Sequence, residues 1–403
     1  MKLLEIGPRT KPRAFHDAAR SLYAGDPNRI APLDMEIEAV FDPRKNVLFN
    51  GGEAIRWILQ DDGGRPLGRT AAFVNPGKAR LRSPVAGGIG FFECVEDQAA
   101  ANALFDAAWE WLERRGCEAM DGSVNFGDNF VHWGVLVEGF TPQGYGMPYN
   151  KPYYGRLFET YGFQEYFRQF TYHFDIHKPL PARQLKFAEF LLTQPRLEFR
   201  HFEHKNPGPF FRDFVEIVNL TWADYLENYQ PVTIEDIEPL FRSAKSILVD
   251  DFMWFAYKDG KPAAVIIAFP DLNQVLAKFD GRLPWWKIPR FLALKSGKTI
   301  TRNRVLLAGV VPEAQNSGVI SALFLVFFRA TASRPHYTEL ELSWVGDYNP
   351  RMRKVYEMIG AVQKKEHVTY RYLFDRSRPF VRFTNAGGHS GLRRDSTKPE
   401  APA

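Results

Sequence analysis

The chain has 403 residues, of which 45% are apolar and 25% are charged. That length exceeds one ordinary hydrophobic core, and the balance of apolar and charged residues excludes a mainly disordered protein. Of the net charge of +5, the segment 376–403 carries +4 through six basic and two acidic side chains, so the remaining chain is nearly neutral. A nearly neutral body argues against a general nucleic-acid-binding protein.

The two cysteines, Cys94 and Cys117, are too few for a disulfide framework or a four-cysteine zinc site. We therefore expect reduced thiols and no bound metal. The N-terminus has no apolar run of signal-peptide length, and the longest apolar stretch, Val319–Phe328, is shorter than the ~20 residues of a membrane-spanning helix. These features predict a cytoplasmic protein and leave a peripheral contact with the inner membrane open.

Two successive halves of the chain have the same predicted order of elements. Each half begins with a strand and a helix, continues with a hairpin marked by Gly-Gly or Asp-Gly, and then alternates strand and helix. In the first half the elements are predicted at Lys2–Ile6, Arg13–Tyr23, Ile55–Gln60, Gly68–Val74, Ile89–Val95, Gln98–Arg115, Cys117–Val124, Tyr153–Tyr161 and Tyr166–Ile176. In the second half they are predicted at Leu197–Glu203, Phe210–Glu227, Phe252–Tyr257, Ala263–Phe269, Arg304–Val311, Gly318–Ser333, Tyr337–Val345, Pro350–Ile359 and Gln363–Phe374. This order predicts an α/β fold with a mixed sheet, repeated twice.

The repeat predicts two domains, at residues 1–177 and 196–375. The linker over residues 178–195 begins with two prolines, Pro179 and Pro181, and contains one short helical stretch, Phe187–Leu192. The segment 376–403 is basic and has little apolar surface to bury, so we expect most of it to be a disordered tail.

The most informative stretch is the loop that ends at Gly318, between a predicted strand and a predicted helix. Backbone N–H groups at a helix start lack intrahelical partners, and the helix dipole adds positive potential, so such a loop suits a diphosphate. Gly318 allows the backbone to approach a phosphate closely. The stretch resembles the acyl-coenzyme A (acyl-CoA) motif of the GNAT acyltransferase superfamily, Val-x-Pro-x-x-Gln/Arg-x-x-Gly-x-Gly/Ala, with Val310, Pro312, Gln315 and Gly318 at the expected offsets.

A second stretch resembles the closing helix of the same superfamily, with Asn349 first, Tyr356 seven residues later and Gly360 four after that. The resemblance implies that acyl-CoA is a co-substrate and that Tyr356 donates a proton to the departing thiolate. The alternative is a core tyrosine whose hydroxyl is satisfied elsewhere. The implied cofactor-binding set is Val310, Val311, Gln315, Asn316, Ser317, Gly318, Val319, Ile320 and Asn349, although Ile320 replaces the usual small residue.

The first half keeps the predicted order of elements but lacks these motifs. Its strand-to-helix junction has no glycine loop, and Glu93, Glu96 and Asp97 would repel a diphosphate. Phe158 stands where the closing-helix tyrosine would be. We therefore interpret this half as a degenerate repeat that shapes the acceptor pocket; the alternative is two working sites.

The implied reaction is attack of a neutral amine on an acyl thioester, with backbone N–H groups near Val310 and Val311 polarising the carbonyl. Alternation along the strand Tyr337–Val345 puts Glu341 on one face with Glu339 and Ser343. Glu341 is the candidate general base, directly or through water. The alternative is that Glu341 pairs with a basic residue.

The segment Lys278–Arg304 combines eight basic residues with Trp285, Trp286 and an apolar stripe. Such a composition is typical of a helix that lies on anionic lipid. Two alternatives are a wall of an acyl-chain tunnel and an insertion that packs on its own domain.

The whole chain also resembles two-repeat bacterial GNAT proteins that include ceramide synthases. This resemblance depends on Met147–Tyr154, Thr221–Trp222 with Asn228, Asp271–Asn273 before Gly281–Pro284, and Glu341–Trp344. It implies transfer of a long fatty acyl group from coenzyme A to the amine of a sphingoid base. The implied substrate-binding residues are Trp344, Trp222, Asn228, Tyr149, Asn150 and Tyr153.

Three other functions stay open. Two are enzymatic: an N-acyl amino acid synthase and a small-molecule N-acetyltransferase. The third is a non-catalytic acyl-CoA or lipid-binding protein, which Ile320 favours and Tyr356 opposes, because a binding protein needs no proton donor.

Overall fold

A computed structural model describes the chain except for residues 8–11, 81–82, 125, 127–132, 224–230 and 385–403. The strands and helices of the first half follow the predicted order. They are β1 (Lys2–Glu5), α1 (Arg13–Leu22), α2 (Asp34–Val40), β2 (Glu53–Gln60), β3 (Pro66–Val74), α3 (Pro76–Ala79), β4 (Ala86–Cys94), α4 (Gln98–Glu113), β5 (Ala119–Gly122), β6 (Val135–Glu138), α5 (Tyr154–Tyr161) and β7 (Gln164–Asp175).

The helix α6 (Ala182–Leu192) joins the halves, and the second half repeats the order of the first. Its elements are β8 (Leu197–His201), α7 (Gly208–Trp222), α8 (Ile234–Ala244), β9 (Met253–Lys258), β10 (Lys261–Pro270), α9 (Asn273–Leu276), α10 (Ile288–Ser296), β11 (Arg302–Val310), α11 (Val319–Ala332), β12 (Glu339–Gly346), α12 (Pro350–Met358) and β13 (Val362–Leu373). The predicted doubled α/β architecture is confirmed.

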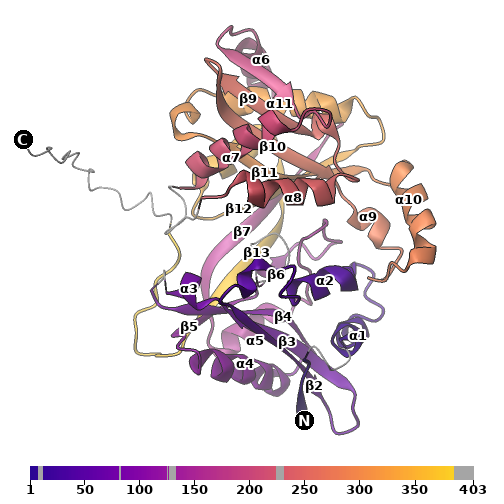
Figure 1. The fold of residues 1–403 in the computed structure, drawn as a ribbon, viewed down its shortest axis with the longest axis vertical. Helices are drawn as coiled ribbons and strands as arrows, with labels where there is room; N and C mark the ends of the chain where they lie inside the picture. The colour runs from indigo at the N-terminus through magenta and orange to yellow at the C-terminus, as the bar shows by residue number, and fades with distance from the viewer. Residues whose placement is uncertain (8–11, 81–82, 125, 127–132, 224–230, 385–403) are drawn as a thin grey trace, which may run out of the picture.

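The described strands form one continuous mixed sheet that runs through both halves. Its order is β1-β2-β3-β4-β5-β13-β7-β12-β11-β10-β9-β8, and β6 also pairs with β13. The last strands of the two halves are therefore exchanged: β7 pairs with β12 of the second half, and β13 pairs with β5 of the first. Figure 1 shows β7 and β13 side by side between the lower and upper parts of the molecule.

Each half contains a pair of parallel strands that separate after a short paired stretch. In the second half, β11 and β12 pair only from Arg302–Val305 to Glu339–Leu342. In the first half, β4 and β5 pair only from Ala86–Ile89 to Ala119–Gly122. Beyond these stretches the two strands of each pair no longer form a ladder with each other.

A register shift accompanies each separation. In β11, Leu306 has no partner in β10, because the pairing of the two strands shifts between Val305 and Leu307. In β4, Phe91 has a positive φ of 51° and lies where the pairing with β3 shifts in a similar way. Such bulges redirect a strand and often lie next to active sites. The first half thus has a β-bulge at the position corresponding to that of the second half, although its sequence motifs differ.

Helix starts distinguish the two halves. In the first half Asp97 caps α4, because its Oδ1 accepts from the N–H groups of Ala99 at 2.8 Å and Ala100 at 3.2 Å. A capping carboxylate satisfies the amides that would otherwise bind an anion. In the second half Gly318, with a φ of 76° and no side-chain cap, precedes α11.

The predicted disordered tail does not begin at residue 376. Phe383 packs against Tyr166 and Phe167, and its N–H donates to the Tyr166 carbonyl at 2.9 Å. Arg382 pairs with Asp347 at 2.7 Å. These contacts tie the described beginning of this segment to the sheet, while residues 385–403 lie outside the described part.

Candidate active site

The loop between β11 and α11 presents a row of backbone donors. Ser317 stabilises the turn, since its hydroxyl donates to the Ala314 carbonyl at 2.7 Å. Among the described residues, no acceptor faces the N–H groups of Asn316, Gly318 and Ile320. Unpaired amides at a helix start, together with the helix dipole, form a site for a phosphate group.

Gly318 is required by its backbone angle and by its neighbours. Its φ of 76° lies in the left-handed region, which side chains other than glycine adopt at a cost. A Cβ atom there would lie 2.6 Å from the ring of Phe187 and 3.1 Å from Leu191, both on α6. The linker helix therefore packs directly against the loop.

The loop and the closing helix are joined by one hydrogen bond, in which Arg351 Nη1 donates to Gln315 Oε1 at 3.0 Å. Asn349 caps this helix, since its Oδ1 accepts from the Met352 N–H at 3.2 Å. The structure therefore brings three predicted residues, Gln315, Asn349 and Tyr356, onto two adjoining elements.

Tyr356 is buried on α12, with its ring 5.4 Å from that of Tyr172 on β7. Its hydroxyl makes no hydrogen bond to another described residue, so the alternative of a core tyrosine with a satisfied hydroxyl is not favoured. Burial, and to a smaller extent Tyr172, raise the pKa of Tyr356 above its ordinary value. The phenol is protonated at neutral pH, as in an ordinary tyrosine, and the raised pKa makes it a weaker acid, so the case for Tyr356 as a proton donor depends on its position and not on its pKa.

Of the two backbone amides that were predicted to polarise the thioester carbonyl, those of Val310 and Val311, only that of Val310 is available at the end of β11. The Val311 N–H donates to the Ala263 carbonyl at 2.9 Å, so it cannot polarise a thioester carbonyl. Successive amides along a strand point to opposite sides, which directs the Val310 N–H toward the separated β12. Trp222 lies against this strand, with its ring 2.9 Å from where a Cβ of Gly309 would be.

Glu341 is fully buried on β12 and surrounded by basic groups. Its Oε1 lies 2.6 Å from Arg304 Nε, and its Oε2 lies 3.4 Å from His173 Nε2 and 3.7 Å from Arg302 Nη1. Burial alone would raise the pKa of Glu341, but Arg304, His173 and Arg302 together lower it well below its ordinary value. This geometry favours the structural alternative over a general base, because a carboxylate so stabilised accepts a proton weakly.

The sequence analysis did not predict the buried charged network around Glu341. Asp271 accepts from the Tyr145 N–H at 2.8 Å, and burial, with the nearby Glu341, raises the pKa of Asp271 to about 6. Lys365 donates to Thr141 Oγ1 at 2.6 Å, and burial lowers the pKa of Lys365 to about 8. One signal was present in β12, where Glu339 and Glu341 alternate with the buried Leu340 and Leu342.

A cluster of aromatic rings connects β12 to the first half. Trp344 packs 5.4 Å from Trp133, which packs 4.6 Å from His367. Burial lowers the pKa of His367 to about 3, so the imidazole is neutral at pH 7. The predicted substrate residue Trp344 therefore contacts side chains from the first half.

The remaining predicted substrate residues are distributed over separate places. Tyr149 and Asn150 line a cavity of about 360 Å³ at the separated ends of β4 and β5, next to Glu93. Asn150 Oδ1 accepts from the Leu136 N–H at 2.6 Å, and the Tyr153 hydroxyl donates to the Cys94 carbonyl at 2.8 Å, so both also hold the local backbone. Asn228 lies outside the described residues.

No protein-family model matches the chain. Over 363 residues it is 29% identical to a bacterial ceramide synthase from Caulobacter vibrioides, covering 87% of this chain and 91% of that protein. It is 26% identical to protein YghO from Escherichia coli over 89% of this chain and 92% of that one.

Two solved structures share the fold at low sequence identity. A tandem GNAT protein from the clavulanic acid biosynthesis pathway matches with a TM-score of 0.55 and 11% identity, covering 94% of this chain and 99% of that one. A GCN5-related N-acetyltransferase from Sphaerobacter thermophilus matches with a TM-score of 0.52 and 14% identity, covering 95% and 98%. With the doubled sheet, these likenesses show that the chain has the two-repeat GNAT fold and is similar to a bacterial ceramide synthase.

Proposed function

We propose that this protein transfers a long-chain acyl group from acyl-CoA to an amine, and that the amine belongs to a sphingoid base. The observation that carries the proposal is the joint arrangement of the amide-rich loop at Gly318, the separated ends of β11 and β12, and the buried phenol of Tyr356. The 29% identity to a bacterial ceramide synthase supports the choice of a lipid acceptor.

In the proposed reaction the amides of Asn316, Gly318 and Ile320 hold the diphosphate of coenzyme A. Its thioester arm enters between β11 and β12, where the Val310 N–H polarises the carbonyl. The amine nitrogen then bonds to the carbonyl carbon and the carbon–sulfur bond breaks. Tyr356 donates its proton to the sulfur, and the proton lost by the amine restores the phenol through water.

We assign Glu341 a positioning role in this reaction. Its carboxylate lies between Arg304, Arg302 and His173 at the base of the separated strands. Removing it leaves the buried Arg304 without a carboxylate partner among the described residues, whereas Arg302 and His173 keep Glu339. With Glu341 in this role, a water molecule accepts the proton of the amine.

A thiol-release assay tests the proposal. Purified protein is mixed with acyl-CoAs of 2 to 18 carbons and with a sphingoid base, an amino acid or a polyamine. We expect thiol release to be fastest with a long-chain acyl-CoA and the sphingoid base. Faster thiol release with an amino acid would favour the N-acyl amino acid synthase. Fastest release with acetyl-CoA and a small amine would favour the small-molecule N-acetyltransferase. Acyl-CoA binding without release from any pair would indicate a binding protein.

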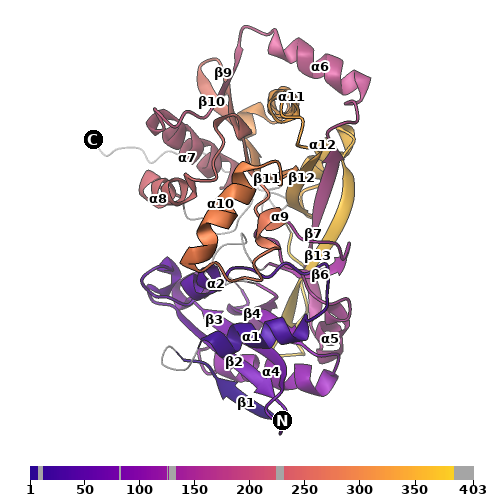
Figure 2. The same ribbon diagram turned by 90° about the vertical axis from the view of Figure 1, so that its right-hand side faces the viewer.

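We further propose that Lys278–Arg304 contacts a membrane surface. Trp285 and Trp286 at the start of α10 are 77% and 63% exposed, whereas Phe279 is buried and anchors the segment. Figure 1 shows α10 at the right-hand side of the molecule, away from the sheet, and in Figure 2, viewed from that side, α10 lies near the centre of the picture. Exposed tryptophans with neighbouring basic residues suit an anionic lipid surface. Within the described residues, no helix is both long and apolar enough to cross a membrane.

The double substitution Trp285→Ala and Trp286→Ala should lower, at least fivefold, the fraction of protein that floats with vesicles containing anionic lipid. The physical reason is the loss of two large apolar side chains that enter the interface. Phe190→Ala, which removes a 60% exposed aromatic side chain from α6, is the matched control and should float like the parent. Undiminished flotation of the double variant would rule out this segment as the contact.

A further inference from the structure

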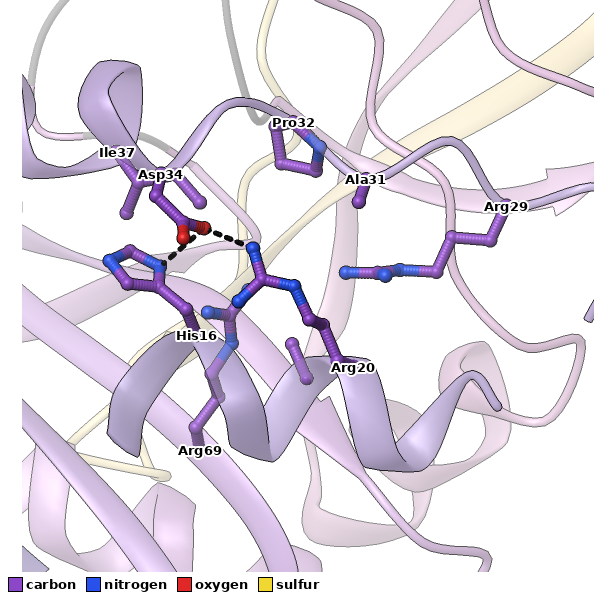
Figure 3. Close-up of a pocket in the computed structure, with 9 residues that line it drawn as sticks. His16, Arg20, Arg29, Ala31, Pro32, Asp34, Ile37 and Arg69 are labelled. Atoms are coloured by element: carbon purple, nitrogen blue, oxygen red, sulfur yellow. Dashed lines mark hydrogen bonds and ion pairs between the residues drawn. The ribbon is translucent and has the colours of Figure 1, made fainter. Parts of the chain in front are cut away.

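A second, small pocket, partly open to solvent, lies in the first half and plays no part in the proposed acyl transfer. It is bounded by α1, β3 and the loop between α1 and α2. Figure 3 shows three guanidinium groups directed toward the same space: Arg20 from α1, Arg29 from the loop and Arg69 from β3. The acidic residue among the lining side chains is Asp34.

Arg69 is a buried cation with a spare donor. It is 1% exposed, its Nη1 donates to the Phe15 carbonyl at 2.9 Å, and its Nη2 lies 3.5 Å from Glu93 Oε1. Its buried Nε has no hydrogen-bond partner among the described residues. Burial lowers the pKa of Arg69, and Arg29 adds to that effect against the opposing influence of Glu93. Such a group gains from an additional acceptor.

Arg29 has no ion pair among the described residues. It lies 4.4 Å above the ring of Tyr23 and is half-buried. Arg20, in contrast, pairs with Asp34 at 2.5 Å and with Asp17 at 3.2 Å. Asp17 and Asp34 thus pair with Arg20, and Glu93 lies near Arg69. The positive charge of Arg29 has no carboxylate partner among the described residues.

We propose that this cavity binds a small oxyanion, the phosphate or carboxylate group of a ligand, between Arg29 and Arg69. Guanidinium groups offer two parallel donors to such a group, and a partly buried site strengthens the attraction. The occupant supplies the counter-charge for Arg29 and an acceptor close to Arg69. This site is separate from the loop at Gly318, and it survives if the acyl-transfer proposal fails.

The occupant can come from solution or from a membrane. One wall of the cavity contacts the segment that leads to α10, because Arg20 Nε donates to the Asp280 carbonyl at 3.2 Å and the Asp34 N–H donates to the Gly281 carbonyl at 3.0 Å. A free phosphate and the phosphate of a lipid headgroup offer the same chemistry to the three arginines.

The experiment compares wild type with Arg29→Gln, Arg29→Lys and Arg44→Gln. Arg44 is 89% exposed and pairs with Asp42, so its replacement removes the same charge far from the cavity. Inorganic phosphate and, separately, acetate are titrated by calorimetry at constant ionic strength, and thermal unfolding is followed with and without each anion. A parallel arm uses vesicles with and without phosphatidic acid.

We expect wild type and Arg44→Gln to bind phosphate or acetate and to unfold at a higher temperature in its presence. Arg29→Gln should bind at least fivefold more weakly, show no such rise, and be no less stable than wild type without anion. Arg29→Lys should be intermediate. Equal affinity in Arg29→Gln, or no binding of either anion, would overturn the proposal. If vesicles with phosphatidic acid bind in an Arg29-dependent way, the source is a lipid headgroup; otherwise it is a free anion.

Discussion

Tyr356→Phe should lower kcat for thiol release at least tenfold and leave the Kd for acyl-CoA within twofold of wild type. The variant removes one hydroxyl that makes no hydrogen bond to another described residue and keeps the ring that packs on Tyr172. Binding depends on the loop amides, which the change does not touch. The loss therefore falls on the step in which the leaving sulfur acquires a proton.

The matched control is Tyr337→Phe, which removes another buried tyrosine hydroxyl in the same half. Burial also raises the pKa of Tyr337, to about 12, and its ring packs on Phe252 rather than on α12. This control should keep the wild-type kcat. An unchanged kcat in Tyr356→Phe would remove Tyr356 from the mechanism, and an equal loss in both variants would point to a general effect on packing.

Local signals in the sequence predicted most elements, but not α2, α3, β6, α8 and α9, and not the pairing of strands across the halves. Gly-Gly and Asp-Gly turns and the helix-ending glycines Gly162 and Gly360 mark element ends directly. The exchange of β7 and β13 leaves no such mark, because either strand presents the same alternating pattern to both possible neighbours. Pairing of strands so distant along the chain is decided by packing that no local window contains.

The loop before Gly318 and the closing helix could be located in the sequence because their residues lie at fixed offsets within short stretches, and their part in binding acyl-CoA stays a prediction. The charged network around Glu341 could not, because it combines Arg304 and His173 from two other strands with Asp271, which follows the end of β10. Alternation in β12 correctly put Glu339 and Glu341 on one face, yet that face is covered by the loop of the first half that contains Gly144. Neighbours of this kind determine whether a carboxylate is a base or a fixed counter-ion.

The first half has the strand arrangement of the second half but carries carboxylates where the second half has its glycine loop. It retains the separated strands and the bulge at Phe91, but Asp97 caps its helix and Glu93 lies in its cavity. Two tyrosine hydroxyls, of Tyr23 and Tyr154, donate to Glu93 at 2.5 and 3.0 Å. A carboxylate held in this way repels a diphosphate. This agrees with the prediction that the first half is a degenerate repeat that does not bind acyl-CoA.

Gly318→Ala should weaken acyl-CoA binding at least tenfold and lower the free energy of unfolding by more than 1 kcal/mol. The backbone angle alone costs an alanine about 1 kcal/mol. The new methyl group would also lie 2.6 Å from the Phe187 ring, so either α6 or the loop must move. Movement of the loop displaces the amides of Asn316 and Ile320, on which the diphosphate depends.

Two further variants separate these effects. Gly260→Ala has the same backbone angle, with a φ of 77°, but no neighbour within 4 Å, so it should lose only about 1 kcal/mol of stability and bind acyl-CoA normally. Adding Phe187→Ala to Gly318→Ala removes the crowding and leaves the backbone cost. If crowding moves the loop, calorimetry of the double variant should show partly restored acyl-CoA binding. Wild-type binding by Gly318→Ala itself would show that the diphosphate lies elsewhere, because no anion held by those amides could tolerate their displacement.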